Sequence, residues 1–393
     1  MQKEFYVMKE FIIPNEIKTV LDMLYQSGFS AYIVGGCVRD ILMDKIPHDY
    51  DVTTSAIPEQ TLEVFRDFQT YELGRKFGTI TVVSGGYHVE ITTMRTEKGY
   101  ADGRRPDEVI FTDSIMEDAS RRDFTINAMA YSLKDGFFDG FDGITDLDNK
   151  LIRAVGDAER RFTEDGLRIM RALRFAARFG FEIEEKTSQA MEKCTFMLDN
   201  IARERIREEL DGFLISKGAV GILDRYFDIF CRIIPQLETA DKSALLGMIA
   251  DAPADNLSRL TALLWQTDEV RDILRNLRHS NEVVSSVAKI VENKDARLEN
   301  DADIRRLMSK IGYENTRILV GLIHKDKADN LERVKNHPHR ISDLAVSGED
   351  LKEMGISGKK IGETLGWLLE AVLENPLLNE KDKLIGNVKS RLA

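Results

Sequence analysis

The chain has 393 residues and a formal net charge of −12 at pH 7, which favours two to four domains and argues against a protein that coats nucleic acid without specificity. Hydrophobic residues make up 43% and charged residues 31% of the sequence, and it has neither an apolar run approaching the roughly 18 residues of a membrane span nor a hydrophobic signal core at its start. Its three cysteines are widely separated, so we expect no disulfide framework, no zinc site and a reducing cytoplasmic location.

The first part of the chain predicts short strands mixed with helices. Apolar residues recur at helical spacing over residues 13–28, which predicts a helix there. Two β-rich runs joined by Gly85-Gly86 predict a hairpin. The elements expected here, in chain order, are the helix 13–28, a strand 31–34, a helix 38–43, a strand 49–53, a helix beginning near Pro58, and hairpin strands 78–84 and 87–93.

One stretch of this region has the composition of a phosphate and metal site. An apolar strand runs into Gly35-Gly36, and a helix begins near Arg39. A glycine turn leading into a helix offers backbone N–H groups and the positive end of the helix dipole to an anion. Asp49 and Asp51 are two residues apart on the next strand, so both would project from one face and repel each other unless a cation lies between them. The stretch predicts a site for a nucleoside triphosphate with Mg²⁺; a hairpin corner with a solvated carboxylate pair is the alternative.

Three further segments of the head contribute candidates. Glu90, in the second hairpin strand, is a candidate third carboxylate beside the aspartate pair. Residues 95–110 contain almost no aliphatic side chains, which predicts a mobile loop. Arg122 and Asp123 lie among apolar neighbours in a segment that predicts a helix starting near Asp123.

After about residue 151 the strand signals stop, and the chain predicts helices with breaks at Pro235, Pro253, Pro338 and Pro376. We therefore expect an α+β protein: a head with a small mixed β-sheet and flanking helices, followed by an elongated all-helical neck, body and tail. The expected boundaries are 1–150 for the head, 151–215 for the neck, 216–295 for the body and 296–393 for the tail.

A second group of charged residues lies at the start of the neck. On a helix, Arg168, Arg171 and Arg174 would fall within about a third of the circumference, and Phe175 would share or border their face. Asp165 precedes Arg168 by three residues, so their side chains would be neighbours. A solvated salt-bridge stripe is the alternative, although several arginines on one stripe repel each other unless anions meet them.

An adjacent aspartate and arginine present one hydrogen-bond acceptor and one donor. Cytosine and adenine offer a donor beside an acceptor, whereas guanine and uracil present the reverse. One Asp–Arg pair can therefore accept C and A and reject G and U, because the wrong bases leave buried polar groups unpaired. Asp165 and Arg168 are predicted to select nucleotides in this way, which suits an enzyme that adds only C and A.

Taken together, these motifs resemble the class II, bacterial-type CCA-adding enzymes of the tRNA nucleotidyltransferase and poly(A) polymerase family. No single motif is unique, but their shared order along the chain is highly specific. The matching motifs are Gly35-Gly36-x-Val38-Arg39-Asp40, Asp49-x-Asp51, Arg121-Arg122-Asp123-Phe124-Thr125-x-Asn127-Ala128, Asp142-Gly143, Glu164-Asp165-x-x-Arg168, Ala202-Arg203-Glu204-Arg205-x-x-Glu208-Glu209 and the segment from Gly348 to Gly362.

The resemblance implies addition of C, C and A to the 3′ end of tRNA from CTP and ATP, without a nucleic-acid template and with release of pyrophosphate. Asp49 and Asp51 would hold two Mg²⁺ ions that bind the triphosphate and activate the tRNA 3′-hydroxyl for in-line attack, and Glu90 would act as catalytic support or base. The nucleotide-binding residues would be Gly36 and Arg39 for phosphates, Arg122 and Asp123 for triphosphate and ribose, Asp165 and Arg168 for the base, and Arg171 and Arg174 for phosphate or for support of that pair.

The resemblance also assigns roles to the remaining parts. The head would be catalytic, the neck would recognise the base, and the tail would bind tRNA. Arg205 and Glu208 would brace the neck. The loop at 95–110, with Arg104, Arg105 and Asp107, is linked in the family to the switch from C to A, so its presence favours complete CCA addition.

Three alternatives stay open at this point. A related RNA nucleotidyltransferase would add poly(A), only CC or only A. A catalytically silent RNA-binding protein would keep the fold, although the intact Asp49/Asp51 pair argues against it. A nucleotidyltransferase acting on a small molecule would have no use for a long helical tail. The sequence does not distinguish a monomer from a homodimer.

Overall fold

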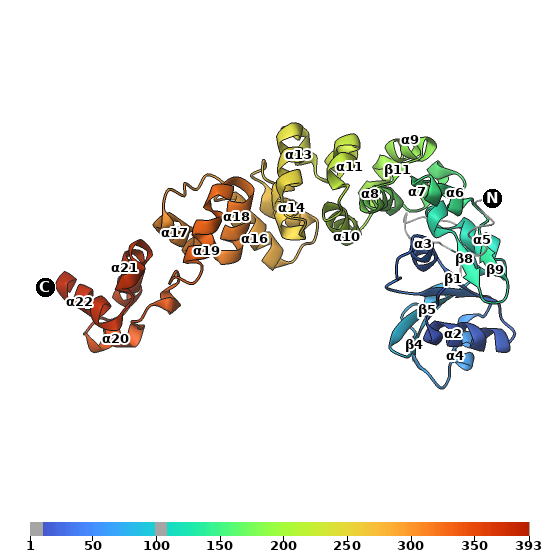
Figure 1. Cartoon of the computed structure of the whole chain (residues 1–393), viewed down its shortest axis with the longest axis horizontal. Helices are drawn as coiled ribbons and strands as arrows, with labels where there is room; N and C mark the ends of the chain where they lie inside the picture. The colour runs from blue at the N-terminus through green and yellow to red at the C-terminus, as the bar shows by residue number, and fades with distance from the viewer. Residues whose placement is uncertain (1–10, 99–107, 393) are drawn as a thin grey trace. The chain divides into compact units, whose positions relative to one another are not determined.

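The computed structural model describes residues 11–98 and 108–392 and divides the chain into two compact units, Met1–Pro235 and Gln236–Ala393 (Figure 1). The first unit contains a mixed sheet followed by helices, and the described residues of the second unit form helices and turns. The predicted α+β class is therefore confirmed, whereas the boundaries at residues 150, 215 and 295 stay predictions. Among the described residues, no helix is long and apolar enough to cross a membrane.

A seven-stranded sheet forms the centre of the head. Its strand order is β3-β4-β5-β2-β1-β8-β9. Strands β2 and β5 pair in parallel, and the other neighbours in this sheet are antiparallel. The bounds are β1 (Ala31–Val34), β2 (Asp51–Thr54), β3 (Gln69–Tyr71), β4 (Thr79–Ser84), β5 (Tyr87–Thr93), β8 (Ala130–Ser132) and β9 (Gly136–Phe138).

Helices α2 (Asn15–Gln26) and α4 (Pro58–Val64) contact each other and pack on this sheet (Figure 1). The apolar stripe that predicted α2 is buried, as helical periodicity requires. Helix α3 (Gly36–Leu42) begins two residues before the prediction. The predicted hairpin is confirmed: Gly85 and Gly86 have φ values of 55° and 91°, which a two-residue type I′ turn needs at both positions.

The predicted loop at 95–110 is partly wrong, because its two ends pair as strands. β6 (Arg95–Lys98) and β7 (Glu108–Phe111) form an antiparallel two-stranded sheet. The missing aliphatic residues misled the prediction, since polar contacts of Arg95 and Glu97 hold this stem. Arg104, Arg105 and Asp107 lie outside the described residues.

The predicted helix near Asp123 is wrong. Helix α5 (Ile115–Ser120) ends before it, and a 3₁₀ turn, η2 (Thr125–Asn127), follows it. The Oδ1 atom of Asp123 accepts from the backbone N–H of Phe124 at 2.8 Å and from Nδ2 of Asn127 at 3.1 Å. Such local side-chain bonds compete with helical ones, and Phe124 is extended instead.

The rest of the first unit is a layer of helices. The prediction that strands stop near residue 151 misses β11 (Glu182–Ile183), which pairs in parallel with β10 (Leu151–Ile152). Helix α10 packs on α8. The helices are α6 (Gly143–Asp148), α7 (Ala158–Glu164), α8 (Leu167–Phe179), α9 (Glu185–Lys193), α10 (Arg203–Leu214), α11 (Ala219–Arg225) and α12 (Phe227–Ile233).

The second unit consists of short helices, and all four predicted proline breaks fall between α-helices. Aspartate, asparagine or serine side chains cap five of these helices by accepting from backbone N–H groups of the first turn. Its helices are α13 (Lys242–Asp251), α14 (Asn256–Leu263), α15 (Val270–Asn276), α16 (Asn281–Val291), α17 (Asp301–Ile311), α18 (Tyr313–Ile323), α19 (Ala328–Val334), α20 (Gly348–Glu353), α21 (Lys359–Glu374) and α22 (Lys381–Leu392).

Candidate active site

The glycine turn between β1 and α3 has a backbone conformation that requires glycine. Gly35 has φ 76° and ψ −130°, a region that residues with a Cβ rarely adopt. A Cβ at this position would lie 3.1 Å from Nη1 of Arg122. The N–H of Gly35 donates to the carbonyl of Met129 at 3.2 Å. The turn, with Gly36 as the first residue of α3, thus lies directly against the guanidinium of Arg122.

Two of the three predicted carboxylates lie on adjacent strands. Asp51 of β2 and Glu90 of β5 are partners in the parallel register, and both side chains are exposed. Although the Asp51 side chain reaches solvent, the protein around it reduces its hydration. This burial, followed by repulsion from Glu90, raises the pKa of Asp51 from its ordinary 3.8 to about 6, with Asp49 adding to the rise and Arg122 opposing it.

Asp49 does not lie on the strand, as the sequence predicted, because β2 begins at Asp51. The Asp49 side chain is 84% exposed, and its Oδ1 atom is 3.3 Å from Nδ1 of His48. Its charge still reaches Asp51. The structure therefore brings Asp51, Glu90 and Arg122 into one electrostatic group, with Asp49 at its solvent edge.

Arg39 was predicted to contact phosphate, and in this structure its side chain is buried. Its Nη1 atom donates to Oδ1 of Asn127 at 2.5 Å, and Nε and Nη2 both donate to Oδ1 of Asp40. The guanidinium carbon lies 4.6 Å from the ring centre of Phe179 in α8, within cation–π range. These contacts join α3 to α8, and a phosphate contact of Arg39 stays a prediction.

Asp123 links the head to the arginine stripe of α8. Its Oδ2 atom accepts from Nε of Arg171 at 2.9 Å and from Nη2 of Arg171 at 2.7 Å. Burial alone would raise the pKa of Asp123, but Arg171, Asn127 and the backbone N–H of Phe124 outweigh it and lower the pKa. With the two bonds to Oδ1, about four acceptor sites are in use. A ribose hydroxyl could bind Asp123 only if one of these donors moved.

The other stripe arginines also meet protein carboxylates. Nε of Arg174 donates to Oε2 of Glu209 in α10, and the Arg174 chain passes over Gly212, where a Cβ would lie 2.8 Å from its Cδ. Arg171 and Arg174 both lie over the ring of Phe175. Sequence reasoning expected anions against this stripe, and the structure supplies them from the protein itself.

Asp165 and Arg168 are not paired with each other in this structure. Asp165 ends α7 in an extended conformation, so it lies outside the helix assumed by the i, i+3 argument. Its carboxylate accepts from Nη1 and Nη2 of Arg205 at 3.3 Å and 2.9 Å, and from the N–H of Leu167 at 3.0 Å. The brace predicted for Arg205 therefore acts on Asp165.

Arg168 holds the end of the head against the neck. Its Nη1 atom donates to Oε2 of Glu164 and to the carbonyl of Arg161, both at 3.0 Å, and Nη2 donates to the carbonyl of Arg121 at 3.1 Å. These bonds use three of the five guanidinium N–H groups. The three bonds of Asp165 use three of about four acceptor sites. Donor and acceptor capacity for a base edge therefore remains on both side chains.

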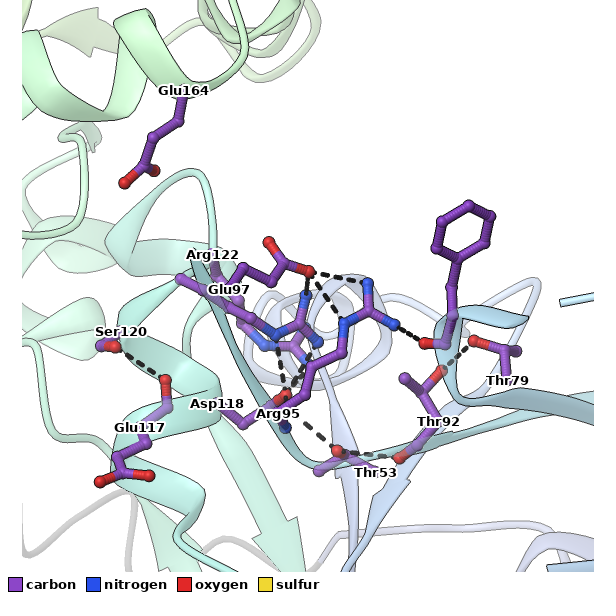
Figure 2. A network of polar contacts seen from close by, with 12 residues as sticks. Thr53, Thr79, Thr92, Arg95, Glu97, Glu117, Asp118, Ser120, Arg122 and Glu164 are labelled. Atoms are coloured by element: carbon purple, nitrogen blue, oxygen red, sulfur yellow. Dashed lines mark hydrogen bonds and ion pairs between the residues drawn. The ribbon is translucent and has the colours of Figure 1, made fainter. Parts of the chain in front are cut away.

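A polar network that includes Arg122 was missed by sequence reasoning (Figure 2). Its centre is Asp118 of α5, which is fully buried. It accepts from Arg121 and Arg122, and Arg121 also donates to Glu97 in β6 at 3.1 Å. The only sequence signal was an aspartate three and four residues before two arginines, which equally describes a solvated helix.

The carboxylates of Asp49, Asp51 and Glu90 fit a Mg²⁺ ion that is also bound by the phosphates of its substrate. Within residues 11–98 and 108–392, no group of three His, Cys, Asp or Glu side chains is arranged around one metal position. Mg²⁺ commonly binds through one or two carboxylates and completes its shell with waters and substrate phosphates. Burial and then repulsion from Glu90 raise the pKa of Asp51, and a bound cation would offset both by stabilising the charged form.

The mixed sheet, the glycine corner and the paired carboxylates define a nucleotidyltransferase head. A family model for the poly A polymerase head domain matches residues 31–153, and a model for tRNA nucleotidyltransferase domain 2 matches residues 255–388. The chain is 36% identical to the CCA-adding enzyme of Enterococcus faecalis over 98% of each chain, and 35% identical to that of Lactiplantibacillus plantarum over 94% of each. The chain belongs to the family of CCA-adding enzymes.

A solved structure gives the same result. The CCA-adding enzyme of Bacillus stearothermophilus in complex with CTP aligns with a TM-score of 0.78 at 29% identity, over 96% of this chain and 98% of that one. The Thermotoga maritima CCA-adding enzyme complexed with tRNA shares the fold, with a TM-score of 0.74 at 23% identity over 98% of each chain.

Proposed function

We propose that the protein adds C, C and A to the 3′ end of tRNA from CTP and ATP and releases pyrophosphate. The observation that carries this proposal is the ion pair between Asp123 and Arg171, which ties α8 to the segment that also carries Arg122. It keeps a reaction site and a separate base-reading site, Asp165 with Arg168, on one framework. The related enzymes described above, one in complex with CTP and one with tRNA, support the choice of these two partners.

The carboxylates of Asp49 and Asp51 would hold Mg²⁺. Bound there, it would supply positive charge to the triphosphate and help ionise the attacking 3′-hydroxyl. Arg122 donates to the triphosphate from its place against Gly35. Glu90 supports Asp51 across the strand pair. Asp165 accepts from the exocyclic amine of C or A, and Arg168 donates to the adjacent ring nitrogen.

The remaining roles complete the proposal. Gly36 offers its backbone N–H to phosphate, and Asp123 orients the ribose side of the pocket through its bonds to Asn127 and Arg171. Arg171 and Arg174 support the base-reading pair by fixing α8. The helical tail from residue 296 binds tRNA, and residues 1–150, 151–215 and 216–295 act as catalytic head, neck and body.

The direct test uses the purified protein and a tRNA transcript that lacks CCA. CTP alone should add two residues, CTP with ATP should add three and then stop, and ATP alone should add one residue only to a transcript that already ends in CC. UTP and GTP should not be used. Long A tails from ATP alone would instead identify a poly(A)-adding enzyme, and two or one added residues with both nucleotides would identify a CC- or A-adding enzyme.

Base selection is tested separately with Asp165→Ala. Removing this acceptor should lower the preference for CTP over UTP by about tenfold or more, because a hydrogen-bond mismatch against a buried group costs on the order of 1–3 kcal/mol. Affinity for tRNA should be unchanged. The matched control is Asp157→Ala, which removes the cap at the other end of α7 and should leave selectivity intact. Unchanged selectivity in Asp165→Ala would contradict the role of this residue.

A further inference from the structure

The end of helix α5 contacts three parts of the first unit. On one side, the carbonyls of Ser120 and Arg121 accept from Arg161 and Arg168 of the neck, at 3.0 Å and 3.1 Å. These are C-terminal carbonyls that lack a partner within their own helix. On the other side, the Asp118 carboxylate faces the β6–β7 stem and the glycine corner.

The two oxygens of Asp118 serve different neighbours. Oδ1 accepts from Nε and Nη2 of Arg121, at 3.0 Å and 2.8 Å, and from the backbone N–H of Arg95 at 3.3 Å. Oδ2 accepts from Nη2 of Arg122 at 3.1 Å and from Oγ1 of Thr53 at 3.5 Å. One oxygen therefore holds the stem, and the other holds the arginine at the active site.

Arg122 depends on this second oxygen for its position. Within the described residues, Asp118 is the side chain that accepts a hydrogen bond from Arg122. With Nη2 held there, Nη1 lies against Gly35, and the positive charge reaches Asp51. Without this bond, the long Arg122 side chain could rotate into other conformations and pair its charge with other anions.

We propose that Asp118 is a positioning residue that holds Arg122 against the glycine turn and thereby sets the affinity of the site for a triphosphate. This inference rests on the proposed role of Arg122 in nucleotide binding. Asp118 itself is buried and does not touch substrate. It is suited to the task because Arg121 and Arg122 outweigh the effect of burial and lower its pKa, so it stays ionised.

The test compares Asp118→Asn with Arg121→Gln in the full-length protein. Asparagine keeps the shape but loses the charge and one of the two acceptor oxygens. Binding of CTP and of inorganic tripolyphosphate, measured by calorimetry, should therefore weaken about tenfold, as expected for a weakened hydrogen bond to a charged group. Arg121→Gln removes the side-chain partner of Oδ1 together with the contact to Glu97, and it should lower thermal stability while leaving both affinities within about twofold. Affinity for tRNA should stay unchanged in both variants.

A double-mutant cycle separates positioning from general damage. In the Arg122→Ala background, Asp118→Asn should have no further effect on tripolyphosphate binding, because the residue it positions is gone. If Asp118→Asn does not fold, the charge-compensated Asp118→Asn/Arg121→Gln variant leaves one fewer buried arginine unpaired and should show the same loss.

The outcomes are distinct. Equal affinity in wild type and Asp118→Asn, or an equal further loss in the Arg122→Ala background, would overturn the inference. Wild-type protein that binds neither CTP nor tripolyphosphate would overturn the proposed function instead.

Discussion

The charge of Asp51 should make the metal-free protein less stable than the Asp51→Asn variant. In Asp51→Asn, a charge that is disfavoured first by burial and then by Glu90 and Asp49 is removed while the shape is kept. The rise of the Asp51 pKa from 3.8 to about 6 corresponds to about 3 kcal/mol as an upper bound, at about 1.4 kcal/mol for each pKa unit. The side chain is exposed, so solvent screening reduces the expected gain to about 1 kcal/mol.

The sign of the pH dependence follows from the direction of the shift. A carboxyl group whose pKa is raised in the folded state binds more protons there than when unfolded, so its cost is absent below about pH 4 and complete above about pH 6. At pH 7.5 in EDTA, Asp51→Asn should therefore raise the melting temperature of the first unit by about 2–4 °C, and the difference should shrink as the pH falls toward 4.

Thermal unfolding followed by calorimetry measures this effect, with Asp67→Asn as a control at a carboxylate that is 88% exposed. Adding Mg²⁺ at pH 7.5 should stabilise the wild type more than the variant, because the metal offsets a negative charge that the substitution has already removed. A variant that melts at or below the wild-type temperature in EDTA at pH 7.5, or a gain independent of pH, would refute the argument that the Asp51 charge costs stability.

Three other expectations follow from the same geometry. Gly35→Ala should weaken CTP binding because the new Cβ displaces the neighbouring Arg122 guanidinium. Gly28→Ala, at a similar φ of 88° and with no neighbour within 4 Å of its Cβ, should lower stability alone. Equal CTP affinity in both variants would argue against a nucleotide site at the Gly35 turn. Asp123→Ala should lower the free energy of unfolding by about 2–3 kcal/mol. This is below the roughly 3–5 kcal/mol typical of a broken buried pair, because Arg171 is 33% exposed. Chemical denaturation should show a much smaller loss for the control Asp199→Ala, which removes an exposed carboxylate. Affinity for tRNA should fall about tenfold or more between roughly 50 and 200 mM salt, and a flat response would contradict a phosphate-binding surface.

The parts of the fold that depend on local patterns could be predicted from the sequence. The Gly85-Gly86 hairpin and the strand leading into Gly35 follow from residues that are adjacent in the chain. Glu90 could be proposed as a third carboxylate beside the aspartate pair because it lies in the second strand of the predicted hairpin. The parallel register that pairs these two residues needed the structure.

The contacts that failed prediction are those whose partners lie far apart in the chain. Asp165 accepts from Arg205, 40 residues away, rather than from Arg168. The reason is that α7 ends before Asp165 and α8 begins only after Gly166, so the two residues do not share one helix. The close packing there is visible only in space: a Cβ on Gly166 would lie 2.8 Å from Cβ of Met197. The stem contact between Arg121 and Glu97 was hidden in the same way, inside a segment that sequence assigned to a loop.

The arginine stripe of α8 pairs with carboxylates of the protein, whereas the sequence left open that phosphates would meet it. Arg171 and Arg174 are paired with Asp123 and Glu209, so carboxylates of the protein already offset much of their charge. Among the described residues, Arg122 lies against the glycine turn and beside Asp51 while bonded to a single carboxylate. We therefore propose that Arg122 contacts the triphosphate and that the stripe fixes α8 on the head. Since Asp165 and Arg168 precede or begin that helix, substitutions in the stripe should alter which nucleotide is chosen more than how tightly its phosphates bind.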